Sequence, residues 1–306
     1  MDRPVAAPLP HAVRPAHGIF WMCTSALASS SMNGLIRETS SDIHPFEIAF
    51  FRNLFGLAAL TPMLLRGGIR ATLRTSHLPL HLWRSVLNAL AMLAFFYAVT
   101  ITPLATVAAL AFTAPLFAAV LAIPILGERP GWRRWAGLLA GFLGALVIVR
   151  PGIGDVSFGM LLVLLSSAAW AGALILIKIL ARTDTSLTIT VYAGMFLTPI
   201  TAIAAAFFWT TPSAGHWLLL IGIGMLGSLT QWSVAQAFHE AEATMVLPFD
   251  FTKLLWAAVI GYLFFSEVPD PLTILGGCLI LASVSYVAYR DRQQRLTRIA
   301  LQAGRP

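Results

Sequence analysis

Three ionisable side chains stand inside stretches that are otherwise apolar, and they are the residues best placed to do chemistry. Arg52 follows the run IAFF, and Asp250 and Lys253 lie three residues apart in a second apolar stretch. Charges in such a setting are costly and usually face a cavity or a partner. Arg52 is expected either to contact an anion such as a carboxylate or to be a structural or snorkelling residue. Asp250 and Lys253 share a helix face, so they either neutralise each other or line a cavity and exchange partners with a solute.

Uncharged polar and aromatic side chains extend this set. They are Asn33, Asn88, Tyr97, Trp170, Gln231 and Gln236. Amides and rings that converge from different helices suit an organic, partly planar solute. The alternative is that these side chains hydrogen-bond neighbouring helices to one another. Taken with the three charges, they predict a binding cavity. No catalytic residue, metal site or cofactor is predicted, because the histidines lack metal-ligand spacing and no nucleotide-binding motif is present.

The composition identifies lipid as the solvent of most of the chain. Of its 306 residues, 58% are hydrophobic and only 11% are charged, against about 25% charged in a typical soluble domain. The net charge of +7 does not indicate nucleic-acid binding, because the basic residues lie in short loops and a tail between apolar segments. The fold class predicted is therefore an all-α integral membrane protein.

Apolar segments of about 20 residues predict transmembrane helices. Ten are predicted, at residues 17–36, 45–65, 79–100, 103–126, 132–150, 157–180, 187–209, 214–237, 243–265 and 271–289. Residues 1–16 are predicted to be a disordered cytoplasmic leader, and residues 290–306 a basic cytoplasmic tail. Of the 20 lysines and arginines, Arg52 and Lys253 lie within helices and only Arg37 and Arg150 lie on one side. The other sixteen share the opposite side, which places both termini in the cytoplasm.

The chain also contains an internal sequence repeat. Residues 104–137 align with residues 243–276 at an offset of 139, with ten of 34 positions identical. Apolar composition alone does not explain a matched Glu-x-Pro at Glu128 and Glu267. The two repeats, 17–150 and 157–289, hold five predicted helices each. Because five is odd, the second enters the membrane in the opposite sense. Inverted repeats are typical of alternating-access transporters, whose site lies near the midplane between the halves.

Longer motifs resemble the EamA-type members of the drug/metabolite transporter superfamily over essentially the whole chain. They are HPFEIAFFRN at 44–53, APLFAAVLAIPILGERP at 114–130, GLLAGFLGALVIVRPG at 137–152 and FFSEVPDPLTILGGCLI at 264–280. Within that family, HPFEIAFFR, a Leu-Trp-Arg before the third helix and the run HEAEAT before the ninth are most similar to the S-adenosylmethionine uptake carriers. The resemblance implies a ten-helix bundle, a central cavity, transport of small organic solutes without ATP, and a homodimer.

The sequence therefore predicts a secondary transporter in a bacterial inner membrane. Its expected partners are the lipid bilayer and a small organic metabolite, such as S-adenosylmethionine or a similar amino-acid or heterocyclic solute. The alternative is an integral-membrane enzyme acting on a lipid-linked substrate, which needs a catalytic cluster near one interface. The pairs Glu38/Asp42 and Glu240/Glu242 come closest, but neither has a partnering base beside it. Import, export and proton coupling all stay open.

Overall fold

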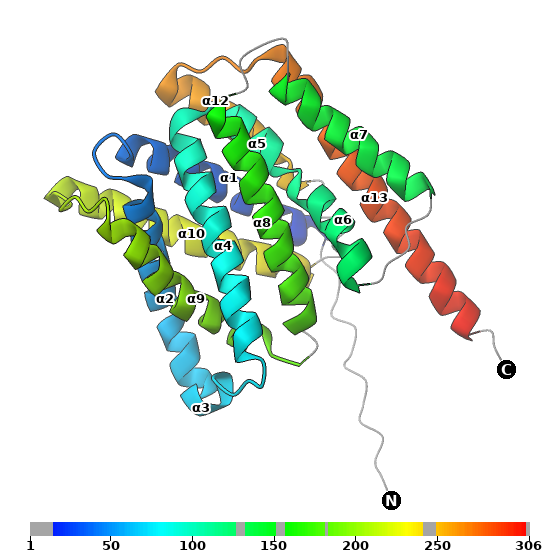
Figure 1. The fold of residues 1–306 in the computed structure, drawn as a ribbon, viewed down its shortest axis with the longest axis horizontal. Helices are drawn as coiled ribbons and strands as arrows, with labels where there is room; N and C mark the ends of the chain where they lie inside the picture. Colours follow the sequence, from blue (N-terminus) through cyan, green and yellow to red (C-terminus); the bar gives the residue numbers. More distant parts are fainter. Residues whose placement is uncertain (1–14, 127–131, 151–156, 181–182, 241–248, 304–306) are drawn as a thin grey trace, which may run out of the picture.

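The computed structural model describes residues 15–126, 132–150, 157–180, 183–240 and 249–303, which form a bundle of α-helices without strands (Figure 1). Most of the predicted leader lies outside the described residues. The helices are α1 (Pro15–Thr39), α2 (Pro45–Gly67), α3 (Ile69–Thr72), α4 (Leu78–Ile101), α5 (Leu104–Ala111), α6 (Ala114–Leu126), α7 (Trp132–Val149), α8 (Phe158–Leu180), α9 (Ser186–Ala206), α10 (Ala214–Glu240), α12 (Thr252–Phe265) and α13 (Pro271–Ala303).

Two helix starts follow directly from local sequence. The ring nitrogen Nδ1 of His44 accepts a hydrogen bond from the backbone N–H of Phe46, and Pro45 takes the first helical position of α2. Proline suits this position because its missing N–H would have no partner there. The Thr185 hydroxyl similarly accepts from the backbone N–H of Thr188 at the start of α9. These caps satisfy backbone donors that a helix start leaves unpaired.

The membrane span predicted over 103–126 is present at Leu104–Ile125, but a break that was not predicted divides it into helices α5 and α6. Helix α5 ends at Ala111. Pro115, four residues on, has no N–H to donate to the carbonyl of Ala111, and its ring disfavours a continuous helix. The Thr113 hydroxyl donates to the carbonyl of Leu110 at 2.6 Å, which stabilises the break.

The same break occurs in the second repeat. Helix α12 begins at Thr252, inside the helix predicted over 243–265, of which residues 243–248 lie outside the described residues. The Thr252 hydroxyl donates to the carbonyl of Phe249 at 2.7 Å, which is the counterpart of the first bond at the offset of 139. The rings of Phe112 and Phe251, another matched pair, pack with centroids 4.6 Å apart. The two breaks therefore meet inside the bundle.

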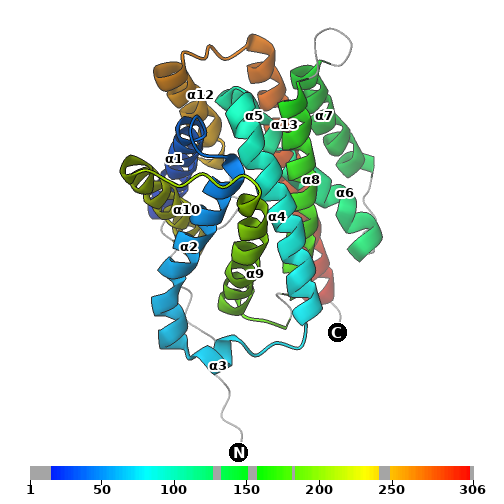
Figure 2. The ribbon, with the colours of Figure 1, turned by 60° about the vertical axis from the view of Figure 1, so that its left-hand side comes forward.

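Helices of the first repeat pack mainly on helices of the second. The principal pairs are α1 with α10, α4 with α8, α2 with α9, and α7 with α13 (Figures 1 and 2). Exchanging the repeats turns the first pair into the second and leaves the other two unchanged. The packing pattern therefore has the symmetry of a duplicated unit.

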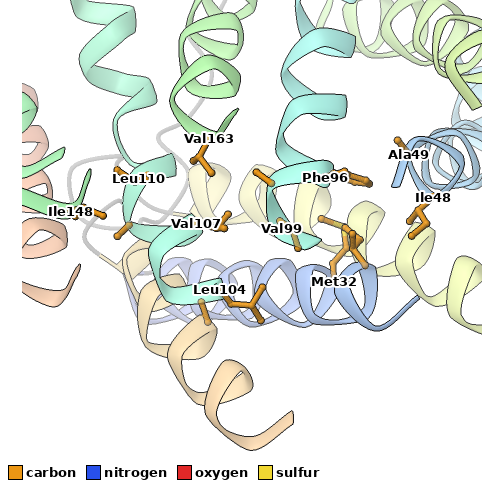
Figure 3. Packing of buried hydrophobic residues seen from close by; sticks show 14 of the residues in the cluster. Met32, Ile48, Ala49, Phe96, Val99, Leu104, Val107, Leu110, Ile148 and Val163 are labelled. Carbon is orange, nitrogen blue, oxygen red and sulfur yellow. The ribbon is translucent and has the colours of Figure 1, made fainter. Parts of the chain in front are cut away.

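The apolar core joins helices of both repeats. Figure 3 shows Met32 of α1, Phe96 and Val99 of α4 and Val107 of α5, all from the first repeat, in one cluster with Val163 of α8 from the second. These side chains are all at least 92% buried. An interior made of such side chains is largely apolar, so the polar groups that do face it are conspicuous.

The outer surface is apolar as well. Leu139, Leu143 and Leu146 of α7 are 61%, 59% and 51% exposed and recur at helical spacing. Within the described residues, five stretches are long and apolar enough to cross a membrane, namely Leu78–Ile101, Leu104–Ile125, Phe158–Ile177, Leu187–Ala206 and Ala214–Val234. Shorter apolar helices are Trp135–Val149, Thr252–Phe265 and Pro271–Tyr286. A count of ten spans stays a prediction.

Helices α7 and α13 approach closely at Gly144 and Gly276. A Cβ added at Gly276 would lie 2.5 Å from the carbonyl oxygen of Gly144 and 2.5 Å from a side-chain carbon of Ile148. Gly276→Ala is therefore expected to lower the free energy of unfolding by about 1–3 kcal/mol, the usual cost of overpacking. Thermal unfolding of the purified protein in detergent measures it. Gly56→Ala is the matched control, because its Cβ would meet nothing within 4 Å. Equal stability of the two variants would contradict the close packing.

Candidate functional site

A cavity of about 430 Å³ lies among α1, α2, α4, α5, α6, α8, α10 and the start of α12. Its size falls within the range of about 300–1,000 Å³ typical of small-molecule pockets. Seven of the nine residues predicted from the sequence line it: Asn33, Arg52, Asn88, Trp170, Gln231, Asp250 and Lys253. The structure thus brings together side chains from both repeats. Their contact with a solute stays a prediction.

The other two predicted residues are not among the described residues that line the cavity. Tyr97 lies near the end of α4, where its ring packs near those of His44, Phe46 and Phe158 with centroids 6.2 to 6.4 Å apart. Gln236 lies more than one helical turn beyond Gln231 along α10. Tyr97 follows the lining residue Phe96 directly, so the face of α4 on which it lies, and not its distance along the helix, sets it outside the cavity.

Arg52 reaches the cavity from α2. Its guanidinium donates to the side-chain oxygen of Asn53 at 3.1 Å, and Asn53 donates in turn to the hydroxyl of Thr201 on α9 at 3.3 Å. It also lies against α10, since a Cβ placed on Gly227 would be 3.1 Å from its Nε. Arg52 forms no ion pair with a carboxylate in the part of the chain that the structure describes. Its structural partners are therefore neutral.

Asp250 and Lys253 do pair. The Lys253 Nζ lies 2.5 Å from an Asp250 carboxylate oxygen, and the two side chains are 25% and 23% exposed. The Ser30 hydroxyl donates to the Lys253 carbonyl at 3.1 Å, which ties α1 of the first repeat to this turn. The pair is thus self-neutralised and also lines the cavity, so both interpretations drawn from the sequence fit the geometry.

Several lining residues were not found from the sequence. Phe95, Phe96 and Phe112 contribute rings, and Met32 contributes a thioether. In apolar helices these residue types carry no signal that separates a cavity face from a packed or lipid-facing one. The doublet Ser166–Ser167 of α8 also lines the cavity. Because these two polar residues interrupt a long apolar run, they could have been chosen from the sequence as cavity residues.

Near one end of the bundle, Glu267 joins the two repeats. It forms an ion pair with Arg37, and its other oxygen accepts from the backbone N–H of Leu104, the first residue of α5, at 2.8 Å. Arg37 also donates to the carbonyl of Thr102 at 2.9 Å and lies over the ring of Phe265 at 5.0 Å. Removing one carboxylate would release contacts with both α1 and α5.

Near the opposite end, Asp184 joins the repeats. It accepts from the Thr75 hydroxyl at 2.7 Å and lies 2.7 Å from Nε2 of His81, whose ring stacks on Tyr192. Tyr192 donates to the carbonyl of Leu73 at 2.9 Å. Desolvation acts to raise the pKa of Asp184, but the hydrogen bonds from Thr75 and His81 outweigh it, so this pKa is lowered. The cavity therefore lies between two groups of contacts that each link the repeats.

Comparison with known proteins decides the family. The sequence pattern of the EamA-like transporter family matches residues 16–150 and 157–289, which is most of the chain. The chain belongs to the EamA-like transporter family. The resemblance seen in its motifs is confirmed, and the protein is a multi-pass membrane transporter rather than an enzyme.

Curated relatives of this EamA-like transporter are full-length matches. An S-adenosylmethionine uptake transporter of Rickettsia bellii is 29% identical over 92% of this chain and 97% of its own. A riboflavin transporter of Vibrio cholerae is 32% identical over 89% of this chain and 93% of its own. A pseudopaline exporter of Pseudomonas aeruginosa is 33% identical over 87% and 94%. A solved crystal structure 15% identical in sequence matches with a TM-score of 0.61 over 91% of this chain and 99% of its own, which shows a shared fold.

The contact between Arg52 and Gly227 gives a test of the cavity in this EamA-like transporter. Gly227→Ala is expected to slow transport about fivefold, because the new Cβ would lie 3.1 Å from Nε of Arg52 and displace the guanidinium. Gly222→Ala on the same helix is the control, since its Cβ would lie 3.6 Å from Leu35, an ordinary contact. Uptake into liposomes, with both variants normalised to the amount of folded protein, measures the effect. Equal transport rates for the two variants would show that the position of the Arg52 guanidinium does not affect transport.

Proposed function

We propose that this protein moves a small organic metabolite across a bacterial inner membrane by alternating access, without ATP. Ten transmembrane helices form two inverted five-helix repeats, and both termini are cytoplasmic. The observation that carries the proposal is the cavity, which draws its polar and charged lining from both repeats and lies where their broken helices meet. Discontinuous helices near the midplane are a common way to expose a site between inverted repeats.

The symmetry of the packing supports the inverted arrangement. The pair α1 with α10 is exchanged with α8 and α4 when the repeats are swapped. The threonine hydroxyls of Thr113 and Thr252 bond the carbonyl three residues earlier in both copies. Two such halves rock about a shared site and expose it to each side in turn.

The cavity lining favours a small metabolite with polar and planar parts. Amides come from Asn33, Asn88 and Gln231, and an indole ring from Trp170. S-adenosylmethionine and related amino-acid or heterocyclic solutes suit this lining, and the relatives named for S-adenosylmethionine and riboflavin make these the first candidates. The nine predicted residues remain the proposed substrate contacts, with Tyr97 and Gln236 set outside the cavity in this conformation. A homodimer stays a prediction.

A metabolite-uptake screen tests the proposal. Cells that overexpress the protein are given a labelled metabolite mixture, and their contents are compared with those of cells expressing a variant with Trp170→Ala and Asn88→Ala. The proposal expects one or a few solutes to accumulate or be depleted at least about tenfold in a way that the variant loses. A profile identical to that of the variant would overturn it.

A further inference from the structure

The charged side chains that line the cavity in the described part of the chain carry a net positive charge. Among the described residues that line it, Arg52 and Lys253 are cationic and Asp250 is anionic. Asp250 and Lys253 neutralise each other at 2.5 Å. This leaves the guanidinium of Arg52 facing the cavity with only neutral hydrogen-bond partners in the described part of the chain. A charge held in low-dielectric surroundings is stabilised by an opposite charge, so the site is incomplete until an anion enters.

The type of cation narrows the type of anion. A guanidinium presents paired N–H donors in a planar fork that matches a carboxylate in a bidentate way. One nitrogen of Arg52 is engaged by Asn53 at 3.1 Å, and the Nε side lies against the backbone at Gly227. The guanidinium is therefore positioned by α2 and α10 rather than free to turn toward water. Preorganisation of this sort favours a single anionic group at a fixed place.

A second group in the cavity, the side-chain oxygen of Asn33, lacks a partner among the described residues. The side-chain oxygen of Asn33 is buried and accepts no hydrogen bond from any described residue, yet Asn33 lines the same cavity. A buried acceptor without a donor is costly, so a solute that brings an N–H or O–H group is favoured. The rings of Phe112 and Trp170 supply the apolar wall for the remainder of such a molecule.

We infer that the transported solute carries a free carboxylate, which Arg52 binds, and an N–H or O–H donor that reaches Asn33. This inference rests on the proposed function and narrows it to amino-acid-like and related organic acids. Heterocycles that lack a carboxylate, riboflavin among them, are then poor substrates even though they fit an aromatic lining. Arg52 is thus the residue that determines specificity, whereas the Asp250–Lys253 pair leaves the charge count unchanged.

Matched acids and amides test the inference in liposomes that contain the full-length protein. The probes are S-adenosylmethionine, phenylalanine, phenylalaninamide and riboflavin, together with each acid returned by the uptake screen and its primary amide. The wild-type protein is expected to take up acids at least about tenfold faster than their amides, since the lost contact is a charge-assisted pair. Arg52→Gln is expected to slow acids at least about tenfold and to leave amides within about twofold. Arg52→Lys is expected to restore part of the acid uptake, because it keeps the charge but loses the fork.

The control is Arg84→Gln. Arg84 is a buried arginine outside the cavity lining that donates to the carbonyl of Ile189 at 2.9 Å, so its loss affects stability but not the ratio of acid to amide uptake. Transport of amides or riboflavin as fast as acids would overturn the inference and leave the proposed function standing. Equal slowing of acids and amides by Arg52→Gln would also overturn it. Failure to transport any solute, here and in the screen, would overturn both.

Discussion

Replacing Asp250 by asparagine is expected to destabilise the protein more than replacing Asp250 and Lys253 together. In the single variant, Lys253 and Arg52 both line the cavity as cations, and no carboxylate remains among its described lining residues. Breaking a largely buried ion pair by removing one partner costs about 3–5 kcal/mol, whereas removing both partners is close to neutral. The order of stability expected is wild type and the double variant first, then Lys253→Gln, then Asp250→Asn. Lys253→Gln is milder because Arg52 still offers a positive charge to Asp250 across the same cavity.

Thermal unfolding in detergent and the yield of monodisperse protein measure this order. The double variant Asp250→Asn with Lys253→Gln serves as its own control, because it contains both substitutions and removes the unpaired charge. Equal stability of all three variants would show that the pair contributes nothing. A double variant as unstable as Asp250→Asn would show that the two side chains do not act on each other.

Replacing Glu267 by alanine is the second change with a large expected effect. Its carboxylate holds Arg37 of α1 and the N–H of Leu104 at the start of α5, and its side chain is only 13% exposed. Hydrogen bonds to charged groups contribute about 1.5–3 kcal/mol each, so their loss shifts the equilibrium between conformations at that end by tenfold or more. The cavity is therefore expected to become more accessible from the end of the bundle at which Glu267 lies.

Cysteine accessibility reports this shift. The native cysteines Cys23 and Cys278 are changed to serine, and one cysteine is placed at the cavity-lining Ala108. Because both termini are proposed to be cytoplasmic, the connection between α12 and α13 that contains Glu267 is external. A membrane-impermeant thiol reagent added outside intact cells is therefore expected to label the cysteine at least about tenfold faster when Glu267 is alanine. Asp42→Asn is the matched control, because Asp42 also links the repeats at this end through His216 but is 65% exposed. An unchanged labelling rate in the Glu267 variant would contradict the prediction that the contacts of Glu267 limit access to the cavity from this end.

The sequence predicted most of the cavity because charges and amides are rare in apolar helices. Arg52, Asp250 and Lys253 could be chosen because a charge inside an apolar membrane helix is energetically costly. The fold places all three on one cavity. The aromatic part could not be chosen in this way. Phe95 and Phe112 are chemically the same as the many phenylalanines that face lipid or the core, and only packing separates them.

The break between α5 and α6 shows a different limit. Pro115 was visible in the sequence, but proline is tolerated within membrane helices, and both Pro124 and Pro199 do lie inside helices here. What ends the helix at Ala111 is Pro115 combined with the Thr113 hydroxyl bond to Leu110. The corresponding break, just before α12, has the matching bond from the Thr252 hydroxyl to the Phe249 carbonyl but Leu254 in place of Pro115. Side-chain hydrogen bonding of this sort depends on tertiary context.

Tyr97 was predicted to line the cavity together with Asn88, a polar residue of the same helix. Helix α4 is 24 residues long, and the cavity occupies only its middle, at Asn88, Ala91, Met92, Phe95 and Phe96. Tyr97 follows Asn88 by nine residues, which places it about 180° away round the helix, on a face that packs near His44 and Phe158. Helical periodicity could therefore have excluded Tyr97, which was included for its residue type.

Uptake of an intact solute into liposomes tests whether the protein is a transporter that uses this cavity. The purified protein is reconstituted, a candidate solute returned by the screen is added outside the liposomes, and the solute recovered from their interior is identified by mass spectrometry. The account predicts saturable uptake of a chemically unchanged solute without ATP, abolished when Arg52 and Asn88 are both replaced by alanine. Recovery of a chemically altered product, or uptake that the double variant retains in full, would contradict it.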